Sequence, residues 1–324
     1  MSETMVPPAD VPVTAGTSPA SSHRFPRPAL HRLGLSPGKK TRLKRLLYDH
    51  GPGGGTLLVL PIDQGLEHGP VDFFINPDAL DPQYQYDLAR DGKFSAIALH
   101  IGLAEKYFHE YAGDVPLILK LNGKTSVPSD AQSFSPLTGT VEDAVRLGAD
   151  AVGYTVYVGS PAQDRDFRQF LDVRQDAERF GMPVVVWAYP RGEAIAKRGG
   201  KESLYAVDYA ARVALELGAD VVKVNYPVAS EKDAESPPPN NTLRLTPNDA
   251  FRKVVESAGR ALVLVSGGEK VGDPELLAKV RSSMDAGATG IIFGRNLWQR
   301  SKVDALRLTR ELHAIFREYA QPPT

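Results

Sequence analysis

Residues 217–225 read LGADVVKVN and residues 147–155 read LGADAVGYT, so one pattern occurs twice in the chain. Residues 286–288, AGA, are a third variant of it. In each copy the glycine can take the left-handed conformation that ends a helix, and an apolar run follows at once. A helix end joined directly to a strand start is the junction of a βα repeat. The pattern therefore predicts parallel strands connected by helices.

Eight apolar runs follow one another from position 57 onward. Each is rich in Val, Ile and Leu, and segments with helical spacing lie between them. Their last residues are between 22 and 41 positions apart, which leaves room for one strand, one helix and two loops per unit. Eight such units predict an α/β fold, the (β/α)8 or TIM barrel. The predicted strands are residues 57–63, 94–100, 116–122, 149–155, 183–189, 219–225, 261–266 and 289–294.

An open, doubly wound sheet is the alternative fold, because it has the same alternation of strands and helices. Dinucleotide-binding sheets of that kind carry a glycine-rich loop, GxGxxG, after the first strand. Residues 63–69 of this chain read DQGLEHG and do not have that spacing. The barrel is therefore favoured over the open sheet.

Composition divides the chain into an extension and one domain. Residues 1–35, rich in Pro, Ser, Ala and Thr, predict a mostly disordered extension, and residues 36–324 form the single predicted barrel domain. Residues 36–50 carry the run KKTRLKR and predict a helix at the bottom of the barrel, with nucleic-acid contact as the alternative for those charges. Residues 227–245 are too polar and proline-rich for regular structure, so they predict a long loop that is a lid, a subunit contact or an insertion without a role.

The composition also excludes several classes of function. The chain has 324 residues, of which 42% are hydrophobic, so it can form a large core without a stabilising disulfide or metal. It has no cysteine, which excludes disulfides, thiolate catalysis and cysteine-bound zinc. A net charge of -1 gives no electrostatic footprint for nucleic acid or an anionic membrane. Without a long apolar stretch or a signal peptide, we expect no membrane association and a cytoplasmic location.

Lys223 lies in an apolar run, beside Val222 and Val224. A lysine that is buried there loses hydration, and this lowers its pKa toward the range in which a neutral amine can attack a carbonyl. Lys223 is therefore a candidate Schiff-base nucleophile. The alternative is a lysine that reaches out of the strand end to solvent. Only a surrounding active site decides between the two.

Chemistry in a TIM barrel occurs where the strands end at their C-terminal edge. Because side chains alternate along a strand, residues two apart share a face. If Lys223 points inward, one carboxylate, two lysines, a tryptophan and a tyrosine meet there. The pairs that share a face are Trp187 with Tyr189, Lys120 with Asn122, Val221 with Lys223, and Pro61 with Asp63.

Two neighbouring strand ends predict a phosphate site. The seventh strand ends in Ser266, Gly267 and Gly268, and the eighth ends in Gly294 and Arg295. Glycines let backbone N–H groups approach an anion, and the guanidinium of arginine matches a phosphate. The loops after strands seven and eight are also a frequent phosphate site of this fold.

A metal centre is the competing chemistry. Of the seven histidines, only His68 and His100 lie near predicted strand ends, whereas zinc needs about three converging ligands. Magnesium bound by Asp63 and Glu67 is an open alternative that nothing in the sequence requires. We therefore expect neither a metal nor a cofactor.

Several short stretches, in this order, resemble the class I (Schiff-base) fructose-bisphosphate aldolases of archaeal and bacterial type. Together they are more specific than any one of them. They are residues 63–69 (DQGLEHG), 119–122 (LKLN), 148–154 (GADAVGY), 157–160 (YVGS), 187–191 (WAYPR), 222–223 (VK), 266–268 (SGG) and 294–295 (GR).

The resemblance implies reversible cleavage of fructose 1,6-bisphosphate to dihydroxyacetone phosphate and glyceraldehyde 3-phosphate, and it also implies a homo-oligomer. The charges add one inference, that Lys120 depresses the pKa of Lys223. Two alternatives stay open: a related Schiff-base aldolase or transaldolase for another phosphorylated keto compound, and a non-catalytic phosphosugar-binding barrel. The resemblance implies these roles: Lys223 forms the Schiff base, Tyr189 is the general acid/base, Trp187 and Asp63 shape the site, and Ser266, Gly267, Gly268, Gly294 and Arg295 bind phosphate.

Overall fold

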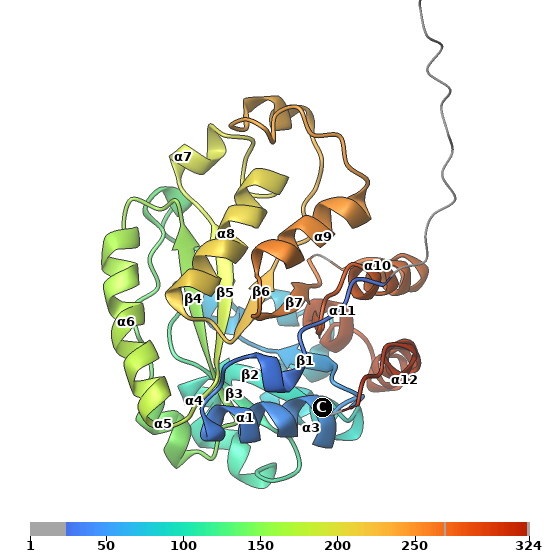
Figure 1. Ribbon diagram of the computed structural model, residues 1–324. Coiled ribbons are helices and arrows are strands. Elements are labelled where there is room, and N and C mark those ends of the chain that lie inside the picture. Colours follow the sequence, from blue (N-terminus) through green and yellow to red (C-terminus); the bar gives the residue numbers. More distant parts are fainter. Residues whose placement is uncertain (1–23, 269, 323–324) are drawn as a thin grey trace, which may run out of the picture.

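Eight parallel strands form a closed barrel in the computed structural model of the chain, which describes residues 24–268 and 270–322 (Figure 1). Each strand pairs with the next, and β1 also pairs with β8, which excludes the open sheet. Each strand overlaps one of the eight predicted runs, so the predicted TIM barrel is confirmed. The strands are β1 Leu57–Pro61, β2 Ala96–His100, β3 Leu117–Lys120, β4 Ala151–Val158, β5 Val184–Pro190, β6 Val221–Val224, β7 Leu262–Ser266 and β8 Gly290–Ile292.

Helices surround the barrel and pack on the outward side chains of the strands. Three shorter helices, α2 Gln64–Glu67, α7 Glu193–Ala196 and α11 Arg295–Trp298, begin soon after the ends of β1, β5 and β8. They therefore lie at the edge where barrels carry their chemistry. The other helices that follow strands or precede them are α3 Pro82–Asp91, α4 Ile101–Tyr107, α5 Val141–Arg146, α6 Gln163–Arg179, α8 Leu204–Leu217, α9 Pro247–Ser257, α10 Asp273–Asp285 and α12 Lys302–Glu318.

Alternation along each strand separates an inner from an outer core. In β6, Val222 and Val224 belong to the outer core between strands and helices, whereas Val221 belongs to the core inside the barrel. Lys223 has the same parity as Val221. The strand therefore directs its lysine into the barrel, because side chains two residues apart on a strand point to the same face.

The basic segment closes the bottom of the barrel, opposite α7 (Figure 1). It forms α1 Pro37–Lys44 and one further turn, Arg45–Asp49, and its Leu43 is fully buried among the inward residues of the strands. Two of its cations bind the aspartates of the repeated LGAD pattern: Lys39 lies 3.0 Å from Asp220, and Arg45 lies 3.0 Å from Asp150. The predicted helix at the barrel bottom is therefore confirmed, and the repeat supplies its anchors.

The prediction of a disordered extension falls largely on residues 1–23, which lie outside the described residues. From Arg24 to position 35 the chain packs against the barrel instead. Arg27 is buried and donates hydrogen bonds to the carbonyl oxygens of Gly55 and Tyr319, and Leu30 is buried in the bottom core. The packed part of the chain thus begins before position 36, because a few apolar and arginine side chains in this segment find partners.

The connection from β6 to α9 is long and irregular, as the composition of residues 227–245 predicts. It contains a single 3-10 turn, Glu231–Glu235. The backbone N–H of Val228 donates to the carbonyl oxygen of Glu202 at 2.8 Å, so the connection lies on the segment that precedes α8. Over the described part of the chain, no helix has the length and apolarity needed to cross a membrane.

Candidate active site

A cleft of about 610 Å³ lies at the C-terminal ends of the strands. Strand ends and the loops that follow them supply its walls. Nearly all the predicted site residues line it, while Trp187 and Lys120 lie buried directly behind its wall. The lining residues used below are Asp63, Glu67, His68, Lys124, Asp130, Tyr189, Arg191, Lys201, Glu202, Lys223, Ser266, Gly267, Gly268, Gly294 and Arg295.

Lys223 is buried at the base of this cleft, with 6% of its surface exposed. Its Nζ donates a hydrogen bond to Tyr189 Oη at 2.6 Å. Burial lowers the pKa of Lys223 to about 8, an effect that Lys120 and Arg295 reinforce and that Asp63 and Glu67 oppose. Near neutral pH a much larger fraction of this amine is therefore neutral, and nucleophilic, than of an ordinary lysine. The alternative of a lysine that reaches out to solvent is wrong.

Trp187 lies between the two lysines of the site. It is fully buried and pairs in register with Lys223 on the neighbouring strand. The centroid of its ring is 5.2 Å from Lys223 Nζ and 4.8 Å from Lys120 Nζ. An aromatic face attracts a cation without supplying the hydration that water would. Trp187 thus keeps both amines in a dry wall.

Lys120 is fully buried and forms ion pairs with two carboxylates. Its Nζ lies 2.8 Å from Glu67 Oε1 and 3.5 Å from Asp63 Oδ2. Burial alone would lower the pKa of Lys120, but the two carboxylates outweigh it and raise that pKa above its ordinary value. Lys120 is thus a fixed positive charge. It lowers the pKa of Lys223 in the predicted direction, although burial is the larger cause.

Glu67 is a site residue that the sequence named only in the alternative of a magnesium site. It lies four positions after Asp63, at the end of the one-turn helix α2. Residues four apart on a helical turn share a face, so both carboxylates reach the same lysine. Burial acts to raise the pKa of Asp63, yet Lys120 and then Lys223 outweigh it and the pKa falls below its usual value. Asp63 therefore remains a carboxylate.

Tyr189 lies one residue before the end of β5, on the strand next to that of Lys223. Burial raises the pKa of its hydroxyl well above the ordinary value for tyrosine, and Glu67 and Asp63 add to this. The hydroxyl is thus protonated in the resting site and holds a proton next to the amine. A group in that position can exchange a proton with a substrate bound on Lys223.

The predicted phosphate residues lie together at one end of the cleft. Ser266 Oγ donates to Asn225 Oδ1 at 2.6 Å, and Arg295 Nη2 donates to the carbonyl oxygen of Gly268 at 3.3 Å. A Cβ atom on Gly294 would come within 2.9 Å of the carbonyl oxygen of Pro61, so only glycine fits. Three glycines thus line the cleft beside the guanidinium group of Arg295, an arrangement suited to an anion.

The opposite end of the cleft carries a second set of cations, which sequence reasoning missed. Lys124, Arg191 and Lys201 line it. Arg191 lies two residues after Tyr189 in the stretch WAYPR, and its position there was the one signal in the sequence for these cations. The others belong to loops, whose paths a repeat pattern does not predict.

His100 ends β2 close to Lys120 but is not placed as a metal ligand. Burial, followed by the charge of Lys120, lowers the pKa of His100 to about 4, so its ring is neutral. Within residues 24–268 and 270–322, no three His, Asp or Glu side chains are grouped so as to hold a metal ion.

The family follows from a comparison with known proteins. A family model described as DeoC/LacD family aldolase matches residues 57–300, which include all eight strands. The chain belongs to this aldolase family. The resemblance seen in the sequence is therefore confirmed.

Individual relatives agree with this assignment. The class 1 fructose-bisphosphate aldolase of Thermoproteus tenax is 43% identical over 259 residues, 80% of this chain and 88% of that protein. A 2-amino-3,7-dideoxy-D-threo-hept-6-ulosonate synthase of Halobacterium salinarum is 33% identical over 285 residues, 88% of this chain and 94% of that protein. A solved archaeal fructose-1,6-bisphosphate aldolase has its catalytic lysine covalently bound to a carbinolamine intermediate of the substrate. It superimposes with a TM-score of 0.71 at 39% identity, covering 85% of this chain and 98% of that one.

Proposed function

We propose that this member of the family is a class I fructose-bisphosphate aldolase with Lys223 as its Schiff-base residue. The observation that carries the proposal is the geometry of Lys223. Its amine is buried, its pKa is lowered to about 8, and it lies 2.6 Å from the protonated hydroxyl of Tyr189. The named relatives at 43% and 39% identity support the choice of substrate.

The first half of the reaction makes an electron sink. The neutral amine of Lys223 forms a bond to C2 of the ketose, and the resulting carbinolamine takes up a proton and loses water to give an iminium ion. When the C3–C4 bond breaks, its electron pair moves to the iminium nitrogen. The product on the lysine is an enamine, so no free carbanion has to form.

Tyr189 moves the protons of the second half. It first gives up its own proton as the carbinolamine loses water, and the resulting phenolate accepts the proton of the C4 hydroxyl as glyceraldehyde 3-phosphate leaves. Tyr189 then returns this proton to C3 of the enamine. Water then hydrolyses the iminium ion and releases dihydroxyacetone phosphate from Lys223. Asp63 and Lys120 keep the surroundings polar while Trp187 excludes water.

A bisphosphate suits a cleft with cations at both ends. The cradle of Gly267, Gly294 and Arg295 would hold the phosphate on C1. Arg191 and Lys124 would meet the phosphate on C6 at the opposite end. Holding both ends fixes C2 against the amine and converts binding into orientation.

A second candidate activity comes from the synthase relative, which matches 88% of this chain at 33% identity. It is a related reaction at the same lysine with another phosphorylated keto compound as substrate. Product analysis with a panel of sugar phosphates separates the two activities. Cleavage of fructose 1,6-bisphosphate to the two triose phosphates supports the aldolase.

Trapping tests the role of Lys223. The protein is incubated with dihydroxyacetone phosphate and reduced with borohydride, and the adduct is located by mass spectrometry. We expect an adduct on Lys223 and none in Lys223→Ala. The matched control is Lys197→Ala, an exposed lysine that pairs with Glu193 and does not line the cleft. An adduct elsewhere, or full activity of Lys223→Ala, would refute the proposal, and binding without turnover would favour a phosphosugar-binding barrel.

We also propose that the enzyme works in the cytoplasm as a homo-oligomer. Residues between positions 71 and 80 support the assembly, because Val71, Phe74, Ile75 and Leu80 are each more than half exposed. Apolar side chains that lie together on a surface are typical of subunit contacts. Sedimentation of the purified protein measures the assembly state, and cell fractionation measures the location.

A further inference from the structure

Asp130 places a carboxylate on the cations at the second end of the cleft. It begins the short 3-10 turn Asp130–Gln132, in the connection between β3 and α5. Its Oδ1 lies 3.0 Å from Lys124 Nζ, and its Oδ2 lies 3.3 Å from Arg191 Nε. Ser133 Oγ donates to the same carboxylate at 3.2 Å. All four side chains thus form one connected polar group around Asp130.

We propose that Asp130 is a specificity-determining residue, whose carboxylate holds the position of the substrate's second phosphate on Lys124 and Arg191 until that phosphate replaces it. The inference rests on the proposed function and adds a residue to it. A substrate with one phosphate leaves the ion pairs of Asp130 intact. A substrate with two phosphates displaces the Asp130 carboxylate from the two cations and places its own phosphate there.

The exchange is chemically favourable for a phosphate. The Asp130 side chain is 52% exposed, so water reaches the carboxylate side of both ion pairs and weakens them by screening. A phosphate carries up to two negative charges and three strong acceptor oxygens, so it binds the same two cations more tightly than a carboxylate does. An anion with only one charge gains no such advantage over Asp130.

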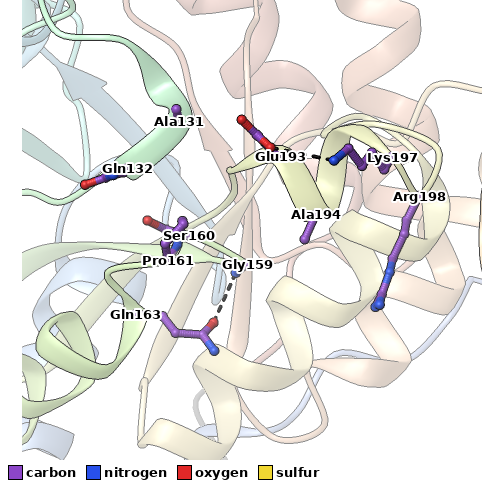
Figure 2. Close-up of a pocket in the computed structure, with 10 residues that line it drawn as sticks. All are labelled: Ala131, Gln132, Gly159, Ser160, Pro161, Gln163, Glu193, Ala194, Lys197 and Arg198. Carbon is purple, nitrogen blue, oxygen red and sulfur yellow. Dashed lines mark hydrogen bonds and ion pairs between the residues drawn. The ribbon is translucent and has the colours of Figure 1, made fainter.

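The turn that carries Asp130 also has space beside it. Residues 125–132 are exposed along their whole length. Behind the turn lies a second cavity of about 750 Å³, with Ala131 and Gln132 on one side and Glu193 and Lys197 on the other (Figure 2). Asp130 can therefore leave the cations without a clash with the barrel.

The test compares two substrates in Asp130→Asn, which keeps the shape of the side chain and removes its charge. We expect the ratio of kcat/KM for fructose 1,6-bisphosphate to kcat/KM for fructose 1-phosphate to rise about three- to ten-fold. The matched control is Glu202→Gln, because Glu202 lines the same cleft and has no ion pair with Lys124 or Arg191. An unchanged or lower ratio overturns the proposal, as does an equal rise in the control.

A binding measurement makes the test independent of turnover. Calorimetric titration with inorganic phosphate should show tighter binding to Asp130→Asn than to the unaltered protein. In an Arg191→Ala background the same substitution should give a smaller gain, because one of the two cations that Asp130 occupies is gone. A gain that is undiminished without Arg191 overturns the proposal. If the protein does not cleave fructose bisphosphate but the variants bind inorganic phosphate as stated, the proposed function fails and the role of Asp130 stands.

Discussion

At the scale of single residues, the amine of Lys223 titrates near pH 8 because it is buried. It is protonated below that pH and neutral above it, and only the neutral form attacks a carbonyl. We predict that the rate of imine formation rises with pH through about 8 and then levels off. Borohydride trapping of dihydroxyacetone phosphate at a series of pH values measures it. A rate that is flat across this range would contradict the pKa.

Lys120 gives a second prediction. Its charge lowers the pKa of Lys223, whereas Asp63 and Glu67 raise it. In Lys120→Met the lowering charge is lost and both carboxylates lose their partner, so the inflection of imine formation moves to higher pH. The same pH series measures the shift. Lys124→Met removes a cation from the cleft rim and serves as the control. An inflection that stays in place, or moves to lower pH, would show that Lys120 does not set the pKa.

Tyr189→Phe separates imine formation from bond cleavage. The ring remains in the wall, but the proton carrier is lost. We predict that the adduct with dihydroxyacetone phosphate still forms, while cleavage of fructose 1,6-bisphosphate falls by roughly 10²- to 10⁴-fold. Trapping and steady-state rates measure the two steps. Loss of both would mean that the hydroxyl is needed to place Lys223, through the 2.6 Å hydrogen bond.

Residues on strands were predictable from the sequence because alternation fixes which side of the barrel they face. Lys223, Trp187 and Tyr189 follow this rule. Glu67 and Asp130 do not, because they lie on short turns whose direction depends on packing. Their carboxylates could be placed only once the path of the loops was known.

At the scale of elements, α1 closes the barrel at the end opposite the cleft. Its Leu43 is fully buried among inward strand residues. We predict that Leu43→Ala lowers the free energy of unfolding by about 2–5 kcal/mol, because it leaves a cavity in the bottom core. KM for the substrate should stay unchanged, because the chemistry lies at the other edge. Denaturant unfolding and steady-state kinetics measure the two quantities, and a large change in KM would show that the two ends are coupled.

Element boundaries were harder to predict than element order. The LGAD repeat marks where β4 and β6 begin, because a glycine ends each preceding helix. The ends differ: β1 stops at Pro61, and β4 continues to Val158 because it pairs with β5 as far as Pro190. The length of a strand depends on how far its neighbour pairs with it, and a local sequence pattern does not contain that information.

At the scale of the whole molecule, the proposed chemistry uses an iminium ion as its electron sink. A metal would have no step to perform. We predict that prolonged treatment with a chelator leaves the cleavage rate within about two-fold of that of the untreated protein, a change that corresponds to a free-energy difference smaller than RT. Steady-state assays before and after dialysis measure it. A loss of activity that zinc restores would favour a metal-dependent aldolase.

The ion pairs of Lys120 have a consequence for the covalent intermediate. Two carboxylates, Asp63 and Glu67, face a single ammonium group there. While Lys223 is neutral, this buried cluster has one negative charge in excess. An uncompensated charge in dry surroundings costs free energy, so the wall favours a cationic iminium over a neutral imine on Lys223. The substrate, by reacting, brings the cluster to electrical neutrality.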